Sequence, residues 1–402
     1  MPSDDRSLFG TALASIPACV VRLTALIVAS LWAATIAISA ELPPWPKKAQ
    51  VIQRLAAFDN PEGAIFSPDG RYLYVSNSAD IGNPNKGLRW THGGGYISKL
   101  RVQPDGTLRI LSKKLVTGLT GPLGMAISTV GTRMFPAGTI FVAESWAFLA
   151  EADGTDVTDS RGLTPKVVAF DSRGKVLGAI RVGPDTAVAR RTGAVGLMGN
   201  AMAVDKAGNL YLTDTGAGAD QYRPPVAAKG GGVYLLPVTS LDTLANGGDA
   251  PVHFLPTPNG GADGVEVAPD GAIHINTVGS AAGLQDPAAG GMYRLVENDF
   301  LSGSLPSPFG RGLGALDGLT FANGKRLDTE VTTNAIVVTP LAGTPTSYRL
   351  EFDKDVKLAG PADIAIRKNS DGSYLLVIPE LSATMPNDNN NMVTVVRLPA
   401  DF

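Results

Sequence analysis

The stretch NPEGAIFSPDGRYLYVSNS, residues 60–78, contains the pattern that decides the fold. It has a short apolar segment, a Pro-Asp-Gly turn and a second apolar segment, which is the signature of a β-hairpin. The same order recurs in five further copies, which lie at 121–145, 199–216, 261–279, 315–334 and 360–380. A unit repeated at intervals of about sixty residues is typical of a repeat architecture.

Each copy is followed by a further apolar segment that predicts a third strand, and several units show a fourth. The last unit ends at Phe402 without a fourth strand, while an unpaired apolar segment, VIQRLAAF at 51–58, precedes the first unit. We therefore predict an all-β fold, a six-bladed β-propeller of four-stranded blades whose ring is closed by this N-terminal strand. Two packed β-sandwiches are the alternative, but they would not explain a displaced first strand.

The composition restricts the possible functions. The 402 residues are 44% hydrophobic and 18% charged with a formal net charge of −3, as in a globular protein with a large core. The near-neutral balance argues against a nucleic-acid binder, which needs a clustered basic surface. One cysteine and three histidines exclude disulfide frameworks and centres built from many Cys or His ligands. Any metal chemistry should therefore use oxygen ligands.

The first forty residues differ from the rest of the chain. An uncharged apolar run extends from Leu23 to Ala40, and a Pro-rich stretch follows it. The run is long for a signal-peptide core and short for a membrane span with flanks. We predict that residues 1–40 are a signal peptide or an N-terminal anchor, 41–49 a Pro-rich linker and 50–402 the propeller. The protein is then expected to be periplasmic or secreted, and to meet a membrane only through an uncleaved leader.

A propeller brings together residues that are far apart in sequence, because the innermost strand of every blade starts near the axis at one face. We call this set of starting positions the hub. Aligning the six units places the following residues at the hub: Glu62, Leu123, Asn200, Asp263, Asp317 and Ala362. Carboxylates this close repel one another unless a cation lies among them or protons are retained. Carboxylate and amide oxygens without histidine or thiolate select a hard divalent cation, with Ca²⁺ favoured. The alternative is that Asn and Asp before Gly are turn residues with only local hydrogen bonds.

The second strand of each blade returns to the same face, and in four units its end carries a polar residue: Asn77, Glu144, Asp214 and Asn276. These side chains are candidates for orienting the metal ligands or contacting substrate, and polar strand ends facing solvent are the alternative. The long loops that follow carry Trp90, His92, Trp146 and Tyr222. Of these, His92 and Trp146 are candidate substrate contacts, and the alternatives are a solvated loop position for the histidine and a packing role for the tryptophan. The other two histidines are expected to be structural, His253 in an outer strand and His274 in the core.

These residues resemble those of the senescence-marker-protein/gluconolactonase family (the regucalcin type), and more distantly those of the paraoxonases and squid-type diisopropylfluorophosphatase. The similarity covers roughly residues 50–400, and PEG followed by SPDGRYLYV is typical of the family. The resemblance implies a calcium ion held by Glu62, Asn200, Asp263 and Asp317. The chain departs from the family at Asp263, where Asn is usual. It also lacks a histidine at Leu123 and Ala362, where the paraoxonases and diisopropylfluorophosphatase respectively have one.

The resemblance implies a calcium-dependent hydrolase of the gluconolactonase type, acting on a small molecule such as a lactone, ester or sugar derivative. Asp317 is the expected catalytic base because the family uses that position in this way, and Asp263 is the second choice. Glu62 and Asn200 are then mainly metal ligands. Three alternatives stay open: a non-catalytic binding propeller, a quinone-dependent sugar dehydrogenase, and an isomerase-like or strictosidine-synthase-like activity. The acidic hub weakens the second, because a quinone cofactor's acidic groups call for cationic residues.

Overall fold

The computed structural model describes residues 42–79, 90–146, 149–150, 164–217, 231–258, 260–279, 290–310, 313–381 and 391–402. The predicted leader at 1–40 and the loop residue Tyr222 lie outside these residues. Within the described segments, no helix is both long enough and apolar enough to cross a membrane.

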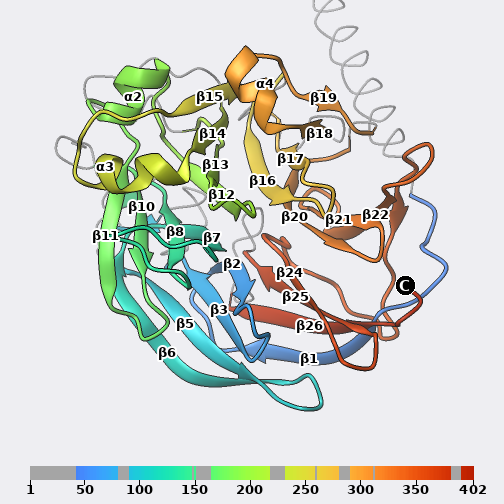
Figure 1. Ribbon diagram of the computed structural model, residues 1–402. Coiled ribbons are helices and arrows are strands. Elements are labelled where there is room, and N and C mark those ends of the chain that lie inside the picture. Colours follow the sequence, from blue (N-terminus) through green and yellow to red (C-terminus); the bar gives the residue numbers. More distant parts are fainter. Residues whose placement is uncertain are drawn as a thin grey trace, which may run out of the picture. The chain divides into compact units, whose positions relative to one another are not determined.

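Six four-stranded antiparallel sheets surround a common axis, which confirms the predicted six-bladed β-propeller (Figure 1). From the axis outward, the first three blades are β2 (Pro61–Phe66), β3 (Tyr72–Asn77), β5 (Gly95–Val102) and β6 (Leu108–Leu119); β7 (Pro122–Ile127), β8 (Ile140–Glu144), β10 (Lys166–Phe170) and β11 (Val176–Arg181); and β12 (Gly199–Val204), β13 (Leu210–Asp214), β14 (Gly232–Leu236) and β15 (His253–Pro256). The last three are β16 (Ala262–Val267), β17 (Ile273–Thr277), β18 (Met292–Leu295) and β19 (Ser307–Pro308); β20 (Leu316–Ala322), β21 (Lys325–Glu330), β22 (Ala335–Pro340) and β23 (Tyr348–Arg349); and β24 (Ala365–Lys368), β25 (Tyr374–Glu380), β26 (Met392–Leu398) and β1 (Gln50–Ala56).

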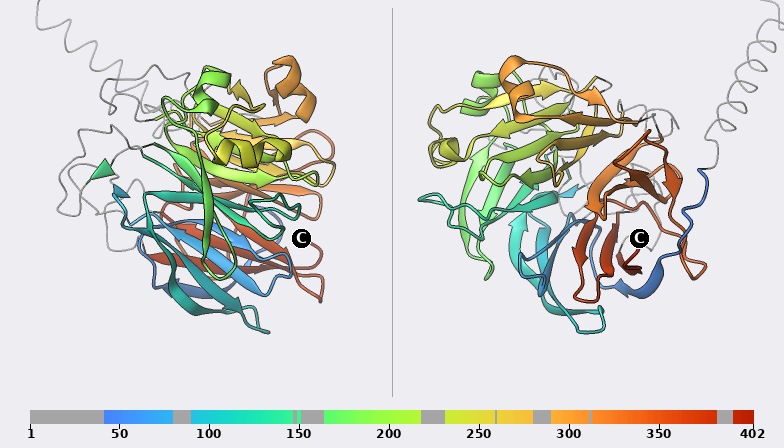
Figure 2. Two further views of the ribbon diagram at one scale, coloured as in Figure 1. Left: turned by 60° about the vertical axis from the view of Figure 1, so that its left-hand side comes forward. Right: turned by 45° about the vertical axis from the view of Figure 1, so that its right-hand side comes forward.

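The ring closes as predicted, because β1 pairs antiparallel with β26 and becomes the outer strand of blade six. The segment before it, predicted as a Pro-rich linker, lies along blade five. There the Trp45 N–H donates to the Arg349 carbonyl at 2.7 Å, and the Trp45 ring lies 5.6 Å from the ring of Phe402. Blade six thus combines the first strand of the propeller, β1, with the last three, β24 to β26. Figure 2 shows the propeller from two further directions.

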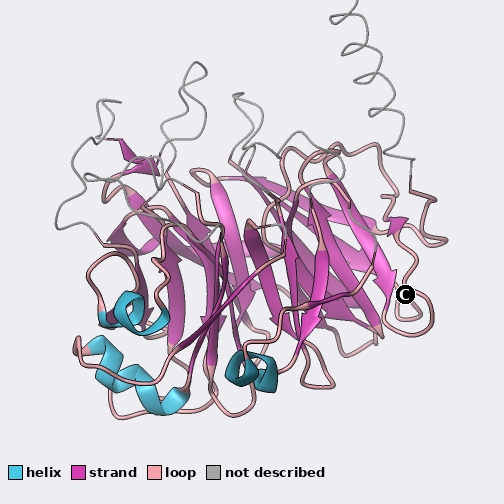
Figure 3. Cartoon of the chain, turned by 90° about the horizontal axis from the view of Figure 1, so that it is seen from above, coloured by secondary structure: helices cyan, strands magenta, loops and turns pink. Residues whose placement is uncertain are grey.

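Short helices and a small additional sheet lie in the connections outside the six blades (Figure 3). They are α2 (Ala187–Thr192), η2 (Val238–Ser240), α3 (Leu241–Ala245) and α4 (Glu297–Ser302), together with a two-stranded parallel sheet of β4 (Trp90–Thr91) and β9 (Leu149–Ala150). These helices could not be predicted from the sequence, because elements of three to six residues are too short to show a helical period.

The hairpin turns follow directly from their residues. In blade one Gly70 adopts a left-handed backbone with φ of 65°, which a residue with a side chain rarely accepts. The adjacent Asp69 accepts a hydrogen bond from the Arg71 N–H at 3.0 Å. The Pro-Asp-Gly sequence therefore encodes the turn that reverses β2 into β3.

The hydrophobic core lies between neighbouring blades. Apolar side chains of β3, β5, β7 and β8 pack together between blades one and two, and similar clusters fill the interfaces from blades two to four and from blades five to one. Between blades four and five a smaller cluster, Met292, Leu313, Leu316 and Val337, is accompanied by the buried ion pair of Arg326 and Asp328.

Candidate functional site

The inner strands approach one another so closely at the hub that their backbones touch. The residue after the hub position is glycine in four blades, and a Cβ on Gly318 would lie 2.3 Å from the Cα of Asp363 in the next blade. A Cβ on Gly264 would lie 2.3 Å from the carbonyl oxygen of Asp317. The Gly in the Glu-Gly and Asp-Gly pairs therefore belongs to a strand, where it permits close packing of backbones.

This packing predicts a large effect for a single methyl group. Gly318→Ala should destabilise the protein by about 1–3 kcal/mol or more, because backbone atoms of blade six must move to admit it. Gly199→Ala is the matched control, since a Cβ there would meet its nearest atom, Leu212 Cδ1, at 3.4 Å. Urea unfolding of both variants measures the difference. Equal stability of the two would show that the hub is loosely packed.

A β-bulge sits at the hub position in each of the first five blades. The pairing of inner and second strands shifts register between Pro61 and Ala64 in blade one, and at the equivalent place in blades two to five. A bulge bends the strand and redirects a side chain that would otherwise follow the regular alternation. The hub side chains owe their direction to this irregularity.

Glu62, Asn200, Asp263 and Asp317 are all buried, with exposed fractions between 1% and 7%. Burial raises the pKa of Glu62 and of Asp263 well above their usual values, and the charge of Asp317 raises both further. Burial also raises the pKa of Asp317, to about 7. The Asn200 amide lies beside Asp263 and opposes the shift of its pKa through a hydrogen bond. The structure thus brings the four predicted ligands into one electrostatically linked group.

Asp363 is a fourth acidic residue in this group, and the alignment of the repeats did not indicate it. Asp363 follows Ala362, the donor-free residue that the alignment placed at the hub of blade six. Burial raises the pKa of Asp363 well above its usual value, and the nearby charge of Asp317 adds to the shift. Asp363 in turn raises the pKa of Glu62 and of Asp263. We call Glu62, Asp263, Asp317 and Asp363 the hub carboxylates.

The residues at the ends of the second strands hold the chain where it enters each blade. Asn77 Oδ1 accepts the Asp59 N–H at 3.1 Å, and Glu144 Oε1 accepts the Thr120 N–H at 3.1 Å. Asp214 accepts three backbone N–H groups, including that of Met198 at 2.9 Å. The oxygens that accept these hydrogen bonds therefore stabilise the backbone of the fold.

In blade four the residue predicted to end the second strand, Asn276, is wrong by one position. Thr277, not Asn276, lies opposite the first residue of the inner strand, as Asn77 does in blade one. Asn276 sits one position earlier, where its side chain reaches toward the inner strands of its own and the next blade.

His92 and Trp146 come from different blades and meet, with ring centroids 5.5 Å apart; Trp146 is buried and His92 exposed. His253 lies in the outer strand β15, as predicted. His274 is buried against Phe309 and Phe321, also as predicted, and burial lowers its pKa to about 3.

The donor set fits a hard cation in chemistry. Three buried oxygens, Glu62 Oε2, Asp263 Oδ1 and Asp317 Oδ1, lack a hydrogen-bond partner in the described part of the protein. Buried carboxylate oxygens without partners are costly and are expected to pair with a cation or keep a proton. However, no three or more His, Cys, Asp and Glu side chains in the described segments stand close enough together to hold a metal ion. Ligation by all four predicted residues would therefore require them to move closer together.

The raised pKa values predict how stability depends on pH. Carboxyl groups whose pKa is higher in the folded state bind more protons there, so they stabilise the fold below about pH 4 and lose that effect as pH rises through the folded pKa. For Asp317 this pKa is about 7. We expect the melting temperature of metal-free protein to fall by several degrees from pH 5 to pH 8, and calcium to reduce the fall. A melting temperature in EDTA that is constant across this range would contradict the electrostatic description of the hub.

An axial cavity of about 200 Å³ continues from the hub region along the inner strands, and residues of all six blades line it. Two partly exposed acids face it, Asp363 and Glu266, and burial raises the pKa of Glu266 to about 7. The cavity is otherwise lined mainly by Ala, Val, Ile, Leu and Met.

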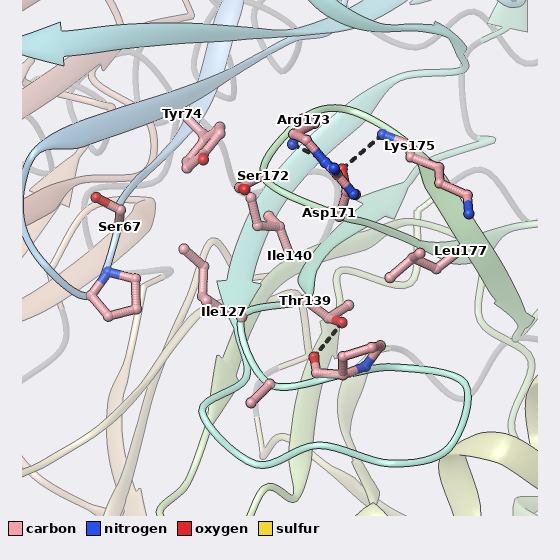
Figure 4. A pocket seen from close by; sticks show the side chains of 14 residues that line it. Ser67, Tyr74, Ile127, Thr139, Ile140, Asp171, Ser172, Arg173, Lys175 and Leu177 are labelled. Atoms are coloured by element: carbon pink, nitrogen blue, oxygen red, sulfur yellow. Dashed lines mark hydrogen bonds and ion pairs between the residues drawn. The ribbon is translucent and has the colours of Figure 1, made fainter.

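A second pocket, of about 520 Å³, lies between blades one and two at the opposite ends of the strands (Figure 4). Ser67, Tyr74 and Thr139 line it, together with Arg173. The Arg173 side chain pairs with Asp171 two residues before it at 3.1 Å, so its charge is already matched. This pocket contains none of the hub carboxylates.

Comparisons with known proteins agree with the architecture. No family model matches the chain, and no curated protein matches it in sequence. Its structural neighbours include a gluconolactonase from Xanthomonas campestris, at TM-score 0.51 and 14% identity, covering 89% of this chain and 97% of that one. A PQQ-bound aldose sugar dehydrogenase from Streptomyces coelicolor matches at TM-score 0.53 and 14% identity, covering 89% and 99%. A glucose dehydrogenase matches at TM-score 0.50 and 13% identity, covering 88% and 100%. At these identities the likeness shows the shared propeller fold.

Proposed function

We propose that this protein is a calcium-dependent hydrolase of lactones or related esters. The observation that carries the proposal is the buried group at the hub, where Glu62, Asp263 and Asp317 each present an oxygen that has no hydrogen-bond partner among the described residues. Glu62, Asn200, Asp263 and Asp317 would hold the ion. When bound, a calcium ion would polarise the carbonyl of a substrate and stabilise negative charge on its oxygen.

Asp317 is proposed as the general base. In the metal-free protein the pKa of Asp317 is about 7. A bound calcium ion would lower this pKa, so the carboxylate would be ionised and able to accept a proton from water near neutral pH. Asp263 is the second candidate, because its Oδ1 has no hydrogen-bond partner in the described part of the chain. Glu62 and Asn200 then act by binding and orienting, and the His92–Trp146 pair is the proposed substrate contact on the loops. We further propose that the protein is periplasmic or secreted, on the apolar run that ends at Ala40.

The test uses the purified protein and a panel of sugar lactones and aryl esters. Turnover should disappear when EDTA removes metal and return when calcium is added, with magnesium as the comparison ion. Turnover that survives complete metal removal would refute the proposal. Calcium binding without any hydrolysis would support the non-catalytic propeller instead, and dye reduction with aldoses and added quinone cofactor would support the dehydrogenase.

A further inference from the structure

A buried polar network crosses the interface between blades four and five. Arg326 and Asp328 lie on β21, are fully buried and pair at 2.6 Å between Nη2 and Oδ1. Asn276 on β17 is also fully buried, and its Nδ2 donates to Asp328 Oδ1 at 3.0 Å. We call these three residues the interface network.

Asn276 contacts the backbone of both strands that carry candidate catalytic acids. Its Oδ1 accepts the Gly264 N–H at 2.7 Å, and its Nδ2 donates to the Gly318 carbonyl at 3.3 Å. Gly264 directly follows Asp263, and Gly318 directly follows Asp317. One amide group therefore bridges the two hub positions.

The other two members fix the direction of that amide. An ionised Asp328 only accepts hydrogen bonds, so it selects the orientation in which Nδ2 of Asn276 faces it and Oδ1 faces Gly264. Arg326 supplies the opposite charge that a buried carboxylate needs. Its guanidinium is held in turn by the Ile275 carbonyl, to which Nη2 donates at 3.1 Å.

Other blades use a simpler device at the same position. Ser76 Oγ accepts the Gly63 N–H at 2.7 Å, and Thr213 Oγ1 accepts the Ala201 N–H at 2.9 Å and donates to the Asp263 carbonyl. In blade four the bridging side chain is additionally anchored by an ion pair. The stronger anchoring lies between the two blades that carry Asp263 and Asp317.

We propose that Asn276, Asp328 and Arg326 are positioning residues that set the relative placement of Asp263 and Asp317 for cation binding. The effect on calcium binding rests on the proposed function, whereas the contacts of these three residues do not. They act through the backbone and are not themselves ligands.

The test measures calcium affinity by titration calorimetry. Asn276→Ala should weaken calcium binding by about 10-fold to 100-fold, the usual cost of removing a residue that orients metal ligands. Asn209→Ala is the matched control, because Asn209 is a buried amide whose side chain bonds Asp205 and the Val238 N–H, outside the hub. It should lower the melting temperature without changing calcium affinity.

A second set of variants keeps side-chain size nearly constant. Asp328→Asn should also weaken calcium binding, because an amide at 328 no longer fixes the direction of the Asn276 amide. Asn276→Asp should weaken it as well, because a carboxylate at 276 cannot donate to the Gly318 carbonyl. Equal calcium affinity of the Asn276→Ala and Asn209→Ala variants would overturn the proposal.

If the wild-type protein binds no calcium, the proposed function fails and crystal structures of the two alanine variants decide the positioning role. A Cα separation of Asp263 and Asp317 that changes in Asn276→Ala but not in Asn209→Ala would support it. An unchanged separation would overturn it.

Discussion

Asp317→Asn is expected to reduce lactone turnover by about 10²-fold to 10⁴-fold while the propeller stays folded. The amide keeps an oxygen for the cation but cannot accept a proton. The same change should raise the melting temperature of the metal-free protein at pH 8. Burial disfavours the ionised carboxylate there, as its pKa of about 7 indicates, and the variant removes that charge.

Activity and stability therefore move in opposite directions at this position. Asp270→Asn is the control, because Asp270 is an exposed turn residue that pairs with Arg294 in the same blade. It should leave both turnover and melting temperature close to the wild-type values. Full lactone turnover in Asp317→Asn would remove the residue from the mechanism.

Arg326→Met is expected to cost about 3–5 kcal/mol of unfolding free energy, because it leaves a buried carboxylate without its cation. Both Arg326 and Asp328 are fully buried, and the arginine donates to both oxygens of the carboxylate. Guanidinium unfolding measures the loss. Arg173→Met is the control, since Arg173 is 85% exposed and pairs with Asp171 in a turn; exposed pairs of this kind contribute about 0–1 kcal/mol.

The double variant Arg326→Met/Asp328→Leu separates the ion pair from the packing. Replacing a whole buried pair with apolar side chains is often neutral, so most of the loss should be recovered. Recovery should stay incomplete by about 1–3 kcal/mol, because Asn276 Nδ2 loses its acceptor on Asp328. If Arg326→Met is no less stable than Arg173→Met, the buried ion pair does not stabilise the fold.

The fold could be predicted because its information is local and repeated. Pro-Asp-Gly and related sequences encode each hairpin turn. In blade one the Asp69 side chain accepts a hydrogen bond from the turn backbone, and Gly70 adopts the left-handed conformation that the turn requires. The unpaired segment at 51–58 then indicated how the ring closes, and β1 occupies that place beside β26.

The site could be predicted only where the repeat could be aligned. A single alignment of the repeats places the four predicted ligands at the hub, because they occupy equivalent positions: Glu62, Asn200, Asp263 and Asp317. Asp363 was missed because blade six places its acid one residue later, where the other blades mostly have the hub glycine.

Of the interface network, only Asn276 could be predicted from the sequence, as a candidate for orienting the metal ligands. In the sequence KRLDTE, Arg326 and Asp328 look like the charged end of an exposed hairpin, and only the neighbouring blade buries them. The close packing of backbones at the hub could not be predicted from the sequence either, because Asp-Gly is common in turns as well as in crowded strands.

The most direct test is a crystal structure of the protein grown with calcium, using the anomalous signal of a lanthanide substitute to locate the ion. We expect a single strong peak coordinated by Glu62, Asn200, Asp263 and Asp317, with the carboxylates drawn closer together than in the metal-free form. Protein that crystallises at saturating calcium with no ion between these four side chains would contradict a metal-dependent hub.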